Sequence, residues 1–317
     1  MTQPSATYAT NDMVGIREDL VDVIYDVSPV DTPFLSMASQ IKATNTNHEW
    51  QVDALAAASA TNFVIEGDDA TTDASSPTTR RGNYTAISDK VARVSGTARS
   101  VTTAGRADEM DYQMLKRAKE LKRDMEKILL ANNAKVGGDD TTARECAGVP
   151  AWIITSVDNN GAGTEPAGDG VAAYITGGSA RQFTEDQLKT VIKSCYDEGG
   201  NPDILLCGSW NRQIASTFGG GTKMQKAEDK TLHTSFDIYE GDFSMSLKIV
   251  PDRFTQVDHV FGLEMEYWKV AFLPGRNMVT TELAKTGDTD QKQILCEYTL
   301  EACNEKSSFA VRDLTTS

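Results

Sequence analysis

The alternation of apolar and polar positions is most regular between residues 107 and 134, where it follows the period of an α-helix. Apolar residues recur there at steps of three and four, which places them on one face of a helix: Met110, Met114, Ala118, Leu121, Met125 and Ile128. At about 1.5 Å per residue such a helix is roughly 40 Å long. The pattern therefore predicts one long amphipathic helix over 107–134.

Basic residues lie on the opposite face of this predicted helix. Four of them form a stripe, namely Lys116, Lys119, Arg123 and Lys127. One interpretation is a docking surface for something acidic, either a partner subunit or enclosed nucleic acid. The alternative is an ordinary solvated helix face, and the sequence leaves both interpretations open.

Residues 184–273 have the pattern of an α/β unit. Thr184 and Gln187 match the capping box that begins a helix, and apolar residues then follow at i, i+3, i+4 and i+7. The apolar run 203–207 predicts a buried strand. Two alternating segments around the turn Glu240–Asp242 predict a hairpin with one buried face. The chain then returns to strands, expected at 269–273, 293–303 and 308–313.

Residues 45–100 predict a long two-stranded ribbon with a polar tip. Trp50–Leu55 alternates like a strand, and strand-like sequence resumes near Tyr84 and continues to Val101. A ribbon of two strands is only marginally stable alone in water. We therefore expect it to lie against something, and a neighbouring subunit is the natural candidate.

Composition and charge exclude several classes of protein. The chain has 317 residues with 31 basic and 46 acidic side chains, for a formal net charge of −15. This charge argues against sequence-specific DNA binding, which requires a basic surface. No apolar run approaches the ~20 residues of a membrane-spanning helix, and the N-terminal sequence predicts no secretory signal. The five scattered cysteines are expected to be free thiols.

Motifs for catalysis, cofactors and metals are missing from the sequence. It has no G-x-S-x-G elbow, no phosphate-binding G-x-x-x-x-G-K-[ST] loop and no H-E-x-x-H. The three histidines are widely separated. We therefore expect no enzyme activity, no cofactor and no metal site. An arm, a ribbon and a long helix beside an α/β unit suit a protein that contacts copies of itself.

This order of parts resembles the major capsid proteins of tailed bacteriophages with the Hong Kong 97 (HK97)-type fold. Local stretches support the resemblance at both ends of the chain. Near the start they are Arg17-Glu18-Asp19-Leu20 and the segment 28–34, and near the end they are the segments 283–288 and 297–301. The middle of the chain is similar in layout only.

The resemblance implies an α+β fold with named parts. They are an N-terminal arm (1–44), an extended E-loop (45–100), a peripheral or P domain (101–183) with its spine helix at 107–134, an axial or A domain (184–267), and a return to the P-domain sheet (268–317). It further implies a structural protein that forms hexamers and pentamers, and these would close into an icosahedral shell around phage double-stranded DNA. In such shells the E-loop lies over a neighbouring subunit.

One departure from the family pattern concerns covalent cross-linking. Some members join an E-loop lysine to an asparagine of a neighbour, but this chain has no lysine between Lys42 and Lys90. An arginine cannot form that bond, so we expect a shell held by noncovalent contacts. Arg80 and Arg81 are candidates to meet carboxylates of the adjacent subunit, with a solvated pair as the alternative.

Further partners and alternative functions follow from the same resemblance. The chain offers no room for a scaffold segment before the arm, so we expect a separate scaffolding protein. We also expect a portal, DNA bound without sequence specificity, assembly in the bacterial cytoplasm and no membrane association, and a cement protein remains open. An encapsulin-like compartment with the same fold is the alternative function, followed by a soluble α/β enzyme or ligand-binding module.

Overall fold

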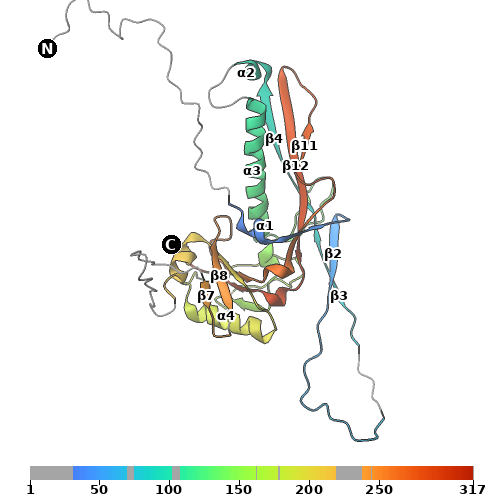
Figure 1. Ribbon diagram of the computed structural model, residues 1–317, viewed down its shortest axis with the longest axis vertical. Coiled ribbons are helices and arrows are strands. Elements are labelled where there is room, and N and C mark those ends of the chain that lie inside the picture. Colours follow the sequence, from blue (N-terminus) through green and yellow to red (C-terminus); the bar gives the residue numbers. More distant parts are fainter. Residues whose placement is uncertain are drawn as a thin grey trace, which may run out of the picture.

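The protein consists of two β-sheets, each covered by helices, and a ribbon that projects from the body (Figure 1). The computed structural model describes residues 31–69, 75–101, 108–161, 163–177, 179–218, 238–243 and 245–316. Within these ranges no helix is long and apolar enough to cross a membrane. Most of the predicted N-terminal arm, residues 1–30, lies outside the described part.

The first sheet has five strands and carries the long helix α3. Its order is β1-β10-β12-β11, and β4 pairs with the other side of β12. The strands are β1 (Ser39–Lys42), β4 (Ala86–Ser95), β10 (Trp268–Phe272), β11 (Val279–Glu282) and β12 (Thr289–Ala302). Helix α3 spans Glu109–Leu130, and Asp108 caps it by accepting a hydrogen bond from the backbone N–H of Met110 at 2.7 Å. The predicted helix is confirmed, with each end a few residues shorter.

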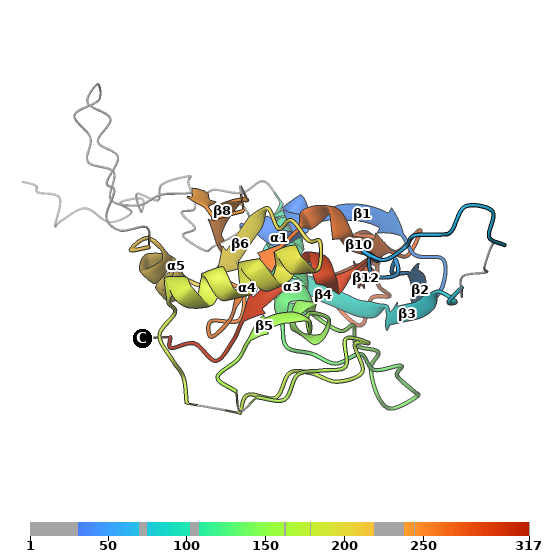
Figure 2. The same ribbon diagram turned by 90° about the horizontal axis from the view of Figure 1, so that it is seen from below.

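The second sheet has six strands in the order β5-β13-β9-β6-β8-β7, with helix α4 (Glu185–Asp197) packed against it (Figure 2). The capping box of α4 is present as predicted. Strand β6 (Ile204–Cys207) is fully buried and parallel to β8 (Ser246–Pro251). The remaining elements are β5 (Ser156–Asp158), α5 (Ser209–Ala215), β7 (Ile238–Glu240), β9 (Val260–Leu263) and β13 (Phe309–Val311). The hairpin of β7 and β8 is confirmed for the described residues, and 219–237 lie outside them.

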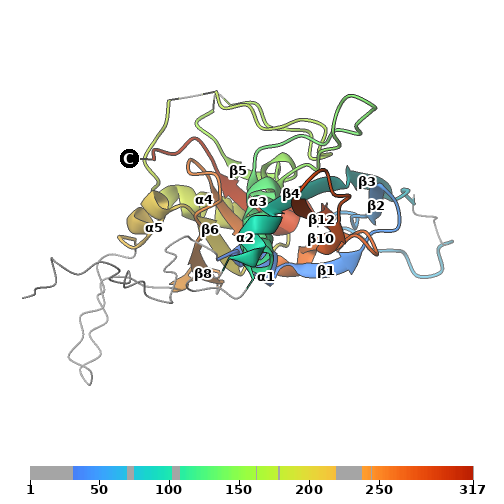
Figure 3. The same ribbon diagram turned by 90° about the horizontal axis from the view of Figure 1, so that it is seen from above.

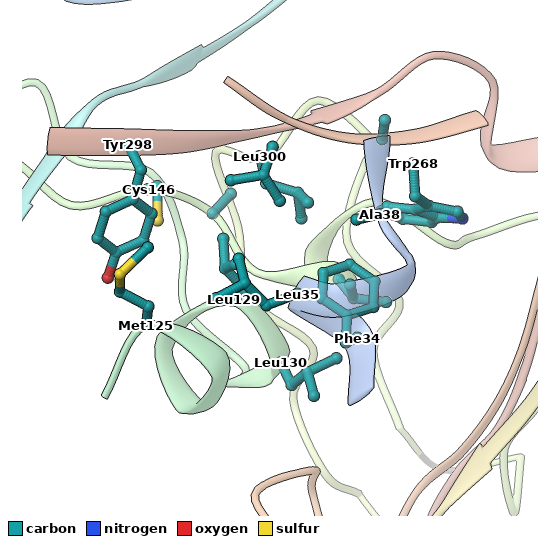
Figure 4. Packing of buried hydrophobic residues seen from close by; sticks show 14 of the residues in the cluster. Phe34, Leu35, Ala38, Met125, Leu129, Leu130, Cys146, Trp268, Tyr298 and Leu300 are labelled. Carbon is teal, nitrogen blue, oxygen red and sulfur yellow. The ribbon is translucent and has the colours of Figure 1, made fainter. Parts of the chain in front are cut away.

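A large hydrophobic core joins the two sheets where the short helix α1 (Pro33–Met37) meets α3. Phe34 and Leu35 of α1 pack against Leu129 and Leu130 near the end of α3, and Trp268 of the first sheet lies close by (Figure 4). Leu121 and Met125 of the predicted apolar face reach this core, together with Leu129 and Leu130, which the sequence analysis did not select. Three short 3-10 helices of the described residues, η2 (Val149–Ala151), η3 (Met265–Tyr267) and η4 (Glu305–Ser307), connect elements around it.

The ribbon differs from its predicted extent. It consists of β2 (Asn47–Val52) and β3 (Thr79–Tyr84), which pair antiparallel. The segment that continues from the ribbon, β4, instead pairs with β12 over ten positions of the first sheet, and Gly96–Ser100 forms a short helix, α2. The expectation that 45–100 forms one ribbon is therefore wrong beyond Tyr84, because strand alternation does not reveal the partner of a strand.

The C-terminal strands also divide between the sheets. β10, β11 and β12 join the first sheet as expected, but β13 lies between β5 and β9 in the second sheet. The expectation that all of 268–317 returns to one sheet is therefore wrong. The residue after β13 holds this arrangement: Arg312 is fully buried, donates to Glu165 at 2.7 Å and to the carbonyl oxygens of Pro150 and Ile153, and lies over the ring of Tyr174.

Candidate self-association surfaces

The base of the ribbon is fastened to the body by buried polar contacts. Asn83 of β3 has no exposed surface; its Nδ2 donates to the carbonyl oxygens of Leu300 (2.9 Å) and Ala147 (3.2 Å), and its Oδ1 accepts from the backbone N–H of Ala147 (2.9 Å). Lys135 Nζ donates to the carbonyl oxygens of Gly82 and Asp169, each at 2.7 Å. Burial lowers the pKa of Lys135. These contacts set the direction in which the ribbon leaves the body.

A second set of contacts fastens the other strand of the ribbon. Nε2 of His48 on β2 lies 2.6 Å from Oε2 of Glu301 on β12, and Trp50 packs on Trp152 with ring centroids 5.2 Å apart. Burial would raise the pKa of Glu301. The hydrogen bonds from His48 and Cys303 and the charge of Lys269 outweigh burial, so this pKa lies below its ordinary value. Both strands are therefore held at the base.

Beyond this base the loop between the two strands is exposed in all of its described residues, 53–69 and 75–78. It carries four large apolar side chains in water: Leu55 is 99% exposed, Phe63 86%, Val64 83% and Ile65 78%. Its charged residues in the described part are all acidic, namely Asp53, Glu66, Asp68 and Asp69. Exposed apolar groups of this size mark interaction surfaces, so this loop has the character of a docking segment.

Arg80 and Arg81 lie at the root of the loop, on β3. Nε of Arg80 is 3.5 Å from Oε1 of Glu49 in the same chain, and the two side chains are 72% and 39% exposed, so the pair contributes little to stability. Arg81 lines a cavity of about 720 Å³ between the ribbon and the body, together with Trp152, Glu198 and Lys306. Neither arginine is fixed in a buried contact, and both stay candidates for contacts with another copy.

The four basic residues predicted to form a stripe on α3 differ in exposure. Lys116, Lys119 and Lys127 are exposed as the sequence predicted, but Arg123 is half-buried with its guanidinium 5.6 Å from the ring centroid of Phe254. Arg123 is therefore engaged within its own chain. Lys122, which the sequence analysis did not select, is exposed and extends the lysine surface.

Glu126, also on α3, holds the chain that enters from the N-terminal arm. It is fully buried, and its two carboxylate oxygens accept hydrogen bonds from the backbone N–H groups of Phe34 (2.7 Å) and Leu35 (2.8 Å). Burial raises the pKa of Glu126 to about 7; the charge of Asp252 adds to the rise, and the two hydrogen bonds oppose it. No sequence pattern singled out Glu126 or Asn83, because each acts on backbone groups far away in the chain.

We expect this carboxyl group to make stability depend on pH. Because its pKa is raised on folding, the folded state holds a proton that the unfolded state releases between about pH 4.5 and 7. The stability that protonated Glu126 contributes is therefore complete below pH 4.5 and is lost as the pH rises through 7. Urea unfolding of the wild type and of Glu126→Gln should show the wild type losing stability relative to the variant as the pH rises over this range. A difference that does not change from pH 5 to 8 would contradict the assignment, since the nearby Asp252 titrates in both proteins.

The described residues contain no cluster of side chains arranged for catalysis or metal binding. No group of three or more histidine, cysteine or acidic side chains is arranged to hold a metal. His48 contacts Glu301 and His259 contacts Asp258, in separate places, and His233 lies outside the described residues. All five cysteines are free, four of them buried, and burial raises the pKa of Cys146 and Cys207 to about 12. These thiols are core residues.

Comparisons with known proteins cover nearly the whole chain. A family model described as SU10 major capsid protein matches residues 3–315. The major capsid protein of Escherichia phage Phieco32 is 29% identical over 341 residues, covering 95% of each chain.

Solved structures match in fold. The capsid asymmetric unit of cyanophage A-1(L) has a TM-score of 0.66 at 11% identity and covers 98% of this chain and 99% of its own. The capsid of the native GTA particle has a TM-score of 0.63 at 12% identity and covers 98% and 100%. A structure of Gordonia phage Cozz has a TM-score of 0.61 at 9% identity and covers 99% and 98%. The HK97-type α+β fold expected from the sequence is confirmed.

Proposed function

The chain belongs to the SU10 major capsid protein family, and from this membership we propose that its copies assemble through hexamers and pentamers into an icosahedral shell around double-stranded DNA. It is a structural component of a phage capsid and not an enzyme.

The observation that carries the proposal is the ribbon with its exposed loop. The base is fixed by Asn83, Lys135 and the contact between His48 and Glu301, whereas the apolar residues 63–65 lie in water. Burial of each large apolar side chain of this segment would supply about 1.5–3 kcal/mol. The single chain does not gain this free energy, because the segment lies in water. A neighbouring copy that covers the loop supplies this burial, and many such contacts add up in a closed shell.

The surface that suits this loop is the face of the first sheet opposite α3. There Ile87 and Val91 of β4 and Val279 of β11 are 37–47% exposed. Residues that pair directly across a ladder share a face. Val279 pairs with Leu295 of β12, and Leu295 pairs with Asp89, which lies between Ile87 and Val91 on the same side of β4, so these apolar side chains lie on one surface. We infer that the loop acts as the E-loop of the family and lies on this sheet face of an adjacent copy, with Arg80 and Arg81 near carboxylates of that copy.

The contacts between copies are noncovalent in this proposal. The segment between Lys42 and Lys90 contains no lysine that an isopeptide cross-link would need. We further propose that the α4 side of the molecule forms the A domain at the centre of each capsomer, and that α3 and the first sheet form the P domain. We also propose that the shell assembles in the host cytoplasm together with a scaffolding protein and a portal. A cement protein is compatible with this assembly as a further partner.

Electron microscopy of the purified protein, alone and with its genomic neighbours co-expressed, tests the proposal. We expect closed shells of uniform size with hexamers and pentamers, and DNA inside them when packaging proteins are present. A homogeneous monomer under every condition would overturn it. Closed shells that hold a protein cargo and never DNA would favour the encapsulin-like alternative, against which the family and the phage relative both argue.

A further inference from the structure

We propose that the lysine face of α3 lines the inside of the shell and contacts the phosphate backbone of the enclosed double-stranded DNA. This inference rests on the proposed function and names the surface that meets the genome. Helix α3 and the first sheet form a layer with two faces, seen along the helix in Figure 3.

Helix α3 covers only one face of the sheet. Ala86, Ala92 and Val94 of β4 are buried, and Ala92 and Val94 pack with Met110 of α3. The alternate residues Ile87 and Val91 point to the opposite face because side chains alternate along a strand. The layer therefore has two outer surfaces, one formed by the exposed side of α3 and one by the sheet. In a shell wall made from such layers, one of these surfaces faces inward.

The helix surface is basic, and four of its lysines carry charges that are not paired among the described residues. Lys116, Lys119, Lys122 and Lys127 are exposed, and none of them forms an ion pair with the residues that the structure describes. The acidic residues among them are already engaged, since Glu120 pairs with Arg117 and Asp124 with Lys90, each at 2.6 Å. In a chain of net charge −15, such a group of unpaired cations on one helix attracts an anionic partner.

The sheet surface has the opposite character. Its charged residues on β4 are Asp89 and Arg93, one of each sign, and each is hydrogen-bonded to a glutamine of β12 (Gln293 at 2.6 Å and Gln291 at 3.2 Å). The rest of this surface of β4 is apolar or uncharged. On β12 the same face carries Glu297, which pairs with Arg144 at 2.7 Å and with Arg276 at 2.6 Å. Because these charges are engaged within the chain, the surface suits an apolar loop better than it suits DNA.

Duplex DNA matches the spacing and the type of the cations. From Lys116 to Lys127 the helix rises about 16 Å, a length over which duplex DNA presents several phosphates on each strand. Lysine ammonium groups act as mobile point charges that read no base sequence, as the lining of a genome container requires. These contacts reduce the repulsion between the acidic chain and the DNA.

The acidic loop of a neighbouring ribbon is the competing partner for these lysines. Its carboxylates, among them Glu66 and Asp68, would complement the charge. Its four exposed apolar residues would find only Leu115 as a large exposed apolar side chain on α3. Docking there would leave most of the apolar surface of the loop in water, so the sheet face is the better place for the loop and DNA is the better partner for α3.

Lysine acetylation of DNA-filled heads and of the same heads after gentle emptying tests the inference. We expect Lys116, Lys119, Lys122 and Lys127 to react at least threefold less in filled heads, with Lys42, Lys193 and Lys248 unchanged between the two. If these lysines react slowly in both filled and emptied heads, another copy covers the face. If they react as fast as the control lysines in both, the face is solvated. Either result overturns the inference. Failure to obtain any closed head would instead count against the proposed function.

Matched variants give a second test that does not depend on reagent access. The triple variant Lys116→Gln, Lys119→Gln, Lys127→Gln and the control Lys42→Gln, Lys193→Gln, Lys248→Gln remove the same charge from exposed positions. We expect both to close shells, and the α3 variant alone to release its DNA at lower temperature and to give fewer filled heads. Identical DNA release by the two variants, or loss of closure in the α3 variant, would overturn the inference.

Discussion

Replacing Phe63, Val64 and Ile65 by serine is expected to abolish shell closure while leaving the subunit folded. These side chains are 78–86% exposed in the single chain, so their replacement changes the unfolding free energy by no more than about 0.5 kcal/mol. Their burial against a neighbour would supply up to about 1.5–3 kcal/mol each, repeated in every copy of the shell. Electron microscopy measures closure, and urea unfolding of the unassembled protein measures the fold.

A matched control separates the loop from exposed apolar surface in general. Val171, Ile175 and Val257 are 57–62% exposed and lie outside the ribbon. Their joint replacement by serine also removes exposed apolar area, from three positions away from the loop, and should leave closure intact. Normal shells from the loop variant would contradict the assignment of the loop as the docking segment. Loss of closure in both variants would show that shell closure depends on exposed apolar area in general and not on the loop in particular.

The single change Asn83→Asp is expected to destabilise the subunit by about 3–5 kcal/mol. It keeps the size of the side chain but replaces an NH₂ group that donates to two carbonyl oxygens, those of Ala147 and Leu300, by a carboxylate oxygen. A buried negative charge would then face two acceptors with no water to solvate it. The ribbon would also lose the contact that sets its direction, so assembly should fail at temperatures at which the wild type assembles.

Urea unfolding measures this loss, with Asn160→Asp as the control. Asn160 makes the same type of donation, from Nδ2 to the carbonyl oxygen of Ser179 at 2.8 Å, but it is exposed. Water solvates a carboxylate there, and we expect a change of at most about 1 kcal/mol. Equal effects at the two positions would show that Asn83 does not anchor the ribbon. Hydrogen exchange of residues 79–84 would report whether the ribbon detaches before the body unfolds.

The roles of Glu126 and Asn83 as buried anchors could not be found from the sequence. Glu126 accepts from residues 91 and 92 positions away, and Asn83 bonds to Leu300 across 217 positions. Each is a polar residue in an otherwise ordinary helix or strand, and its importance comes from the backbone groups it meets. Such long-range partners depend on how the elements pack, which local pattern does not encode.

The sequence by itself determined the elements whose signals are local. The apolar period predicted α3, the capping box at Thr184 predicted α4, the apolar run predicted β6, and the excess of acidic residues together with the missing motifs argued against an enzyme or a sequence-specific DNA-binding protein. Only the tertiary structure decided that β4 leaves the ribbon to pair with β12, that β13 joins the second sheet and that Arg123 turns to Phe254. Periodicity reports which side of an element is buried, because burial repeats with the geometry of a helix or a strand. It does not report which distant segment provides the burial, and in this chain that choice separates the anchored base of the ribbon from its exposed loop.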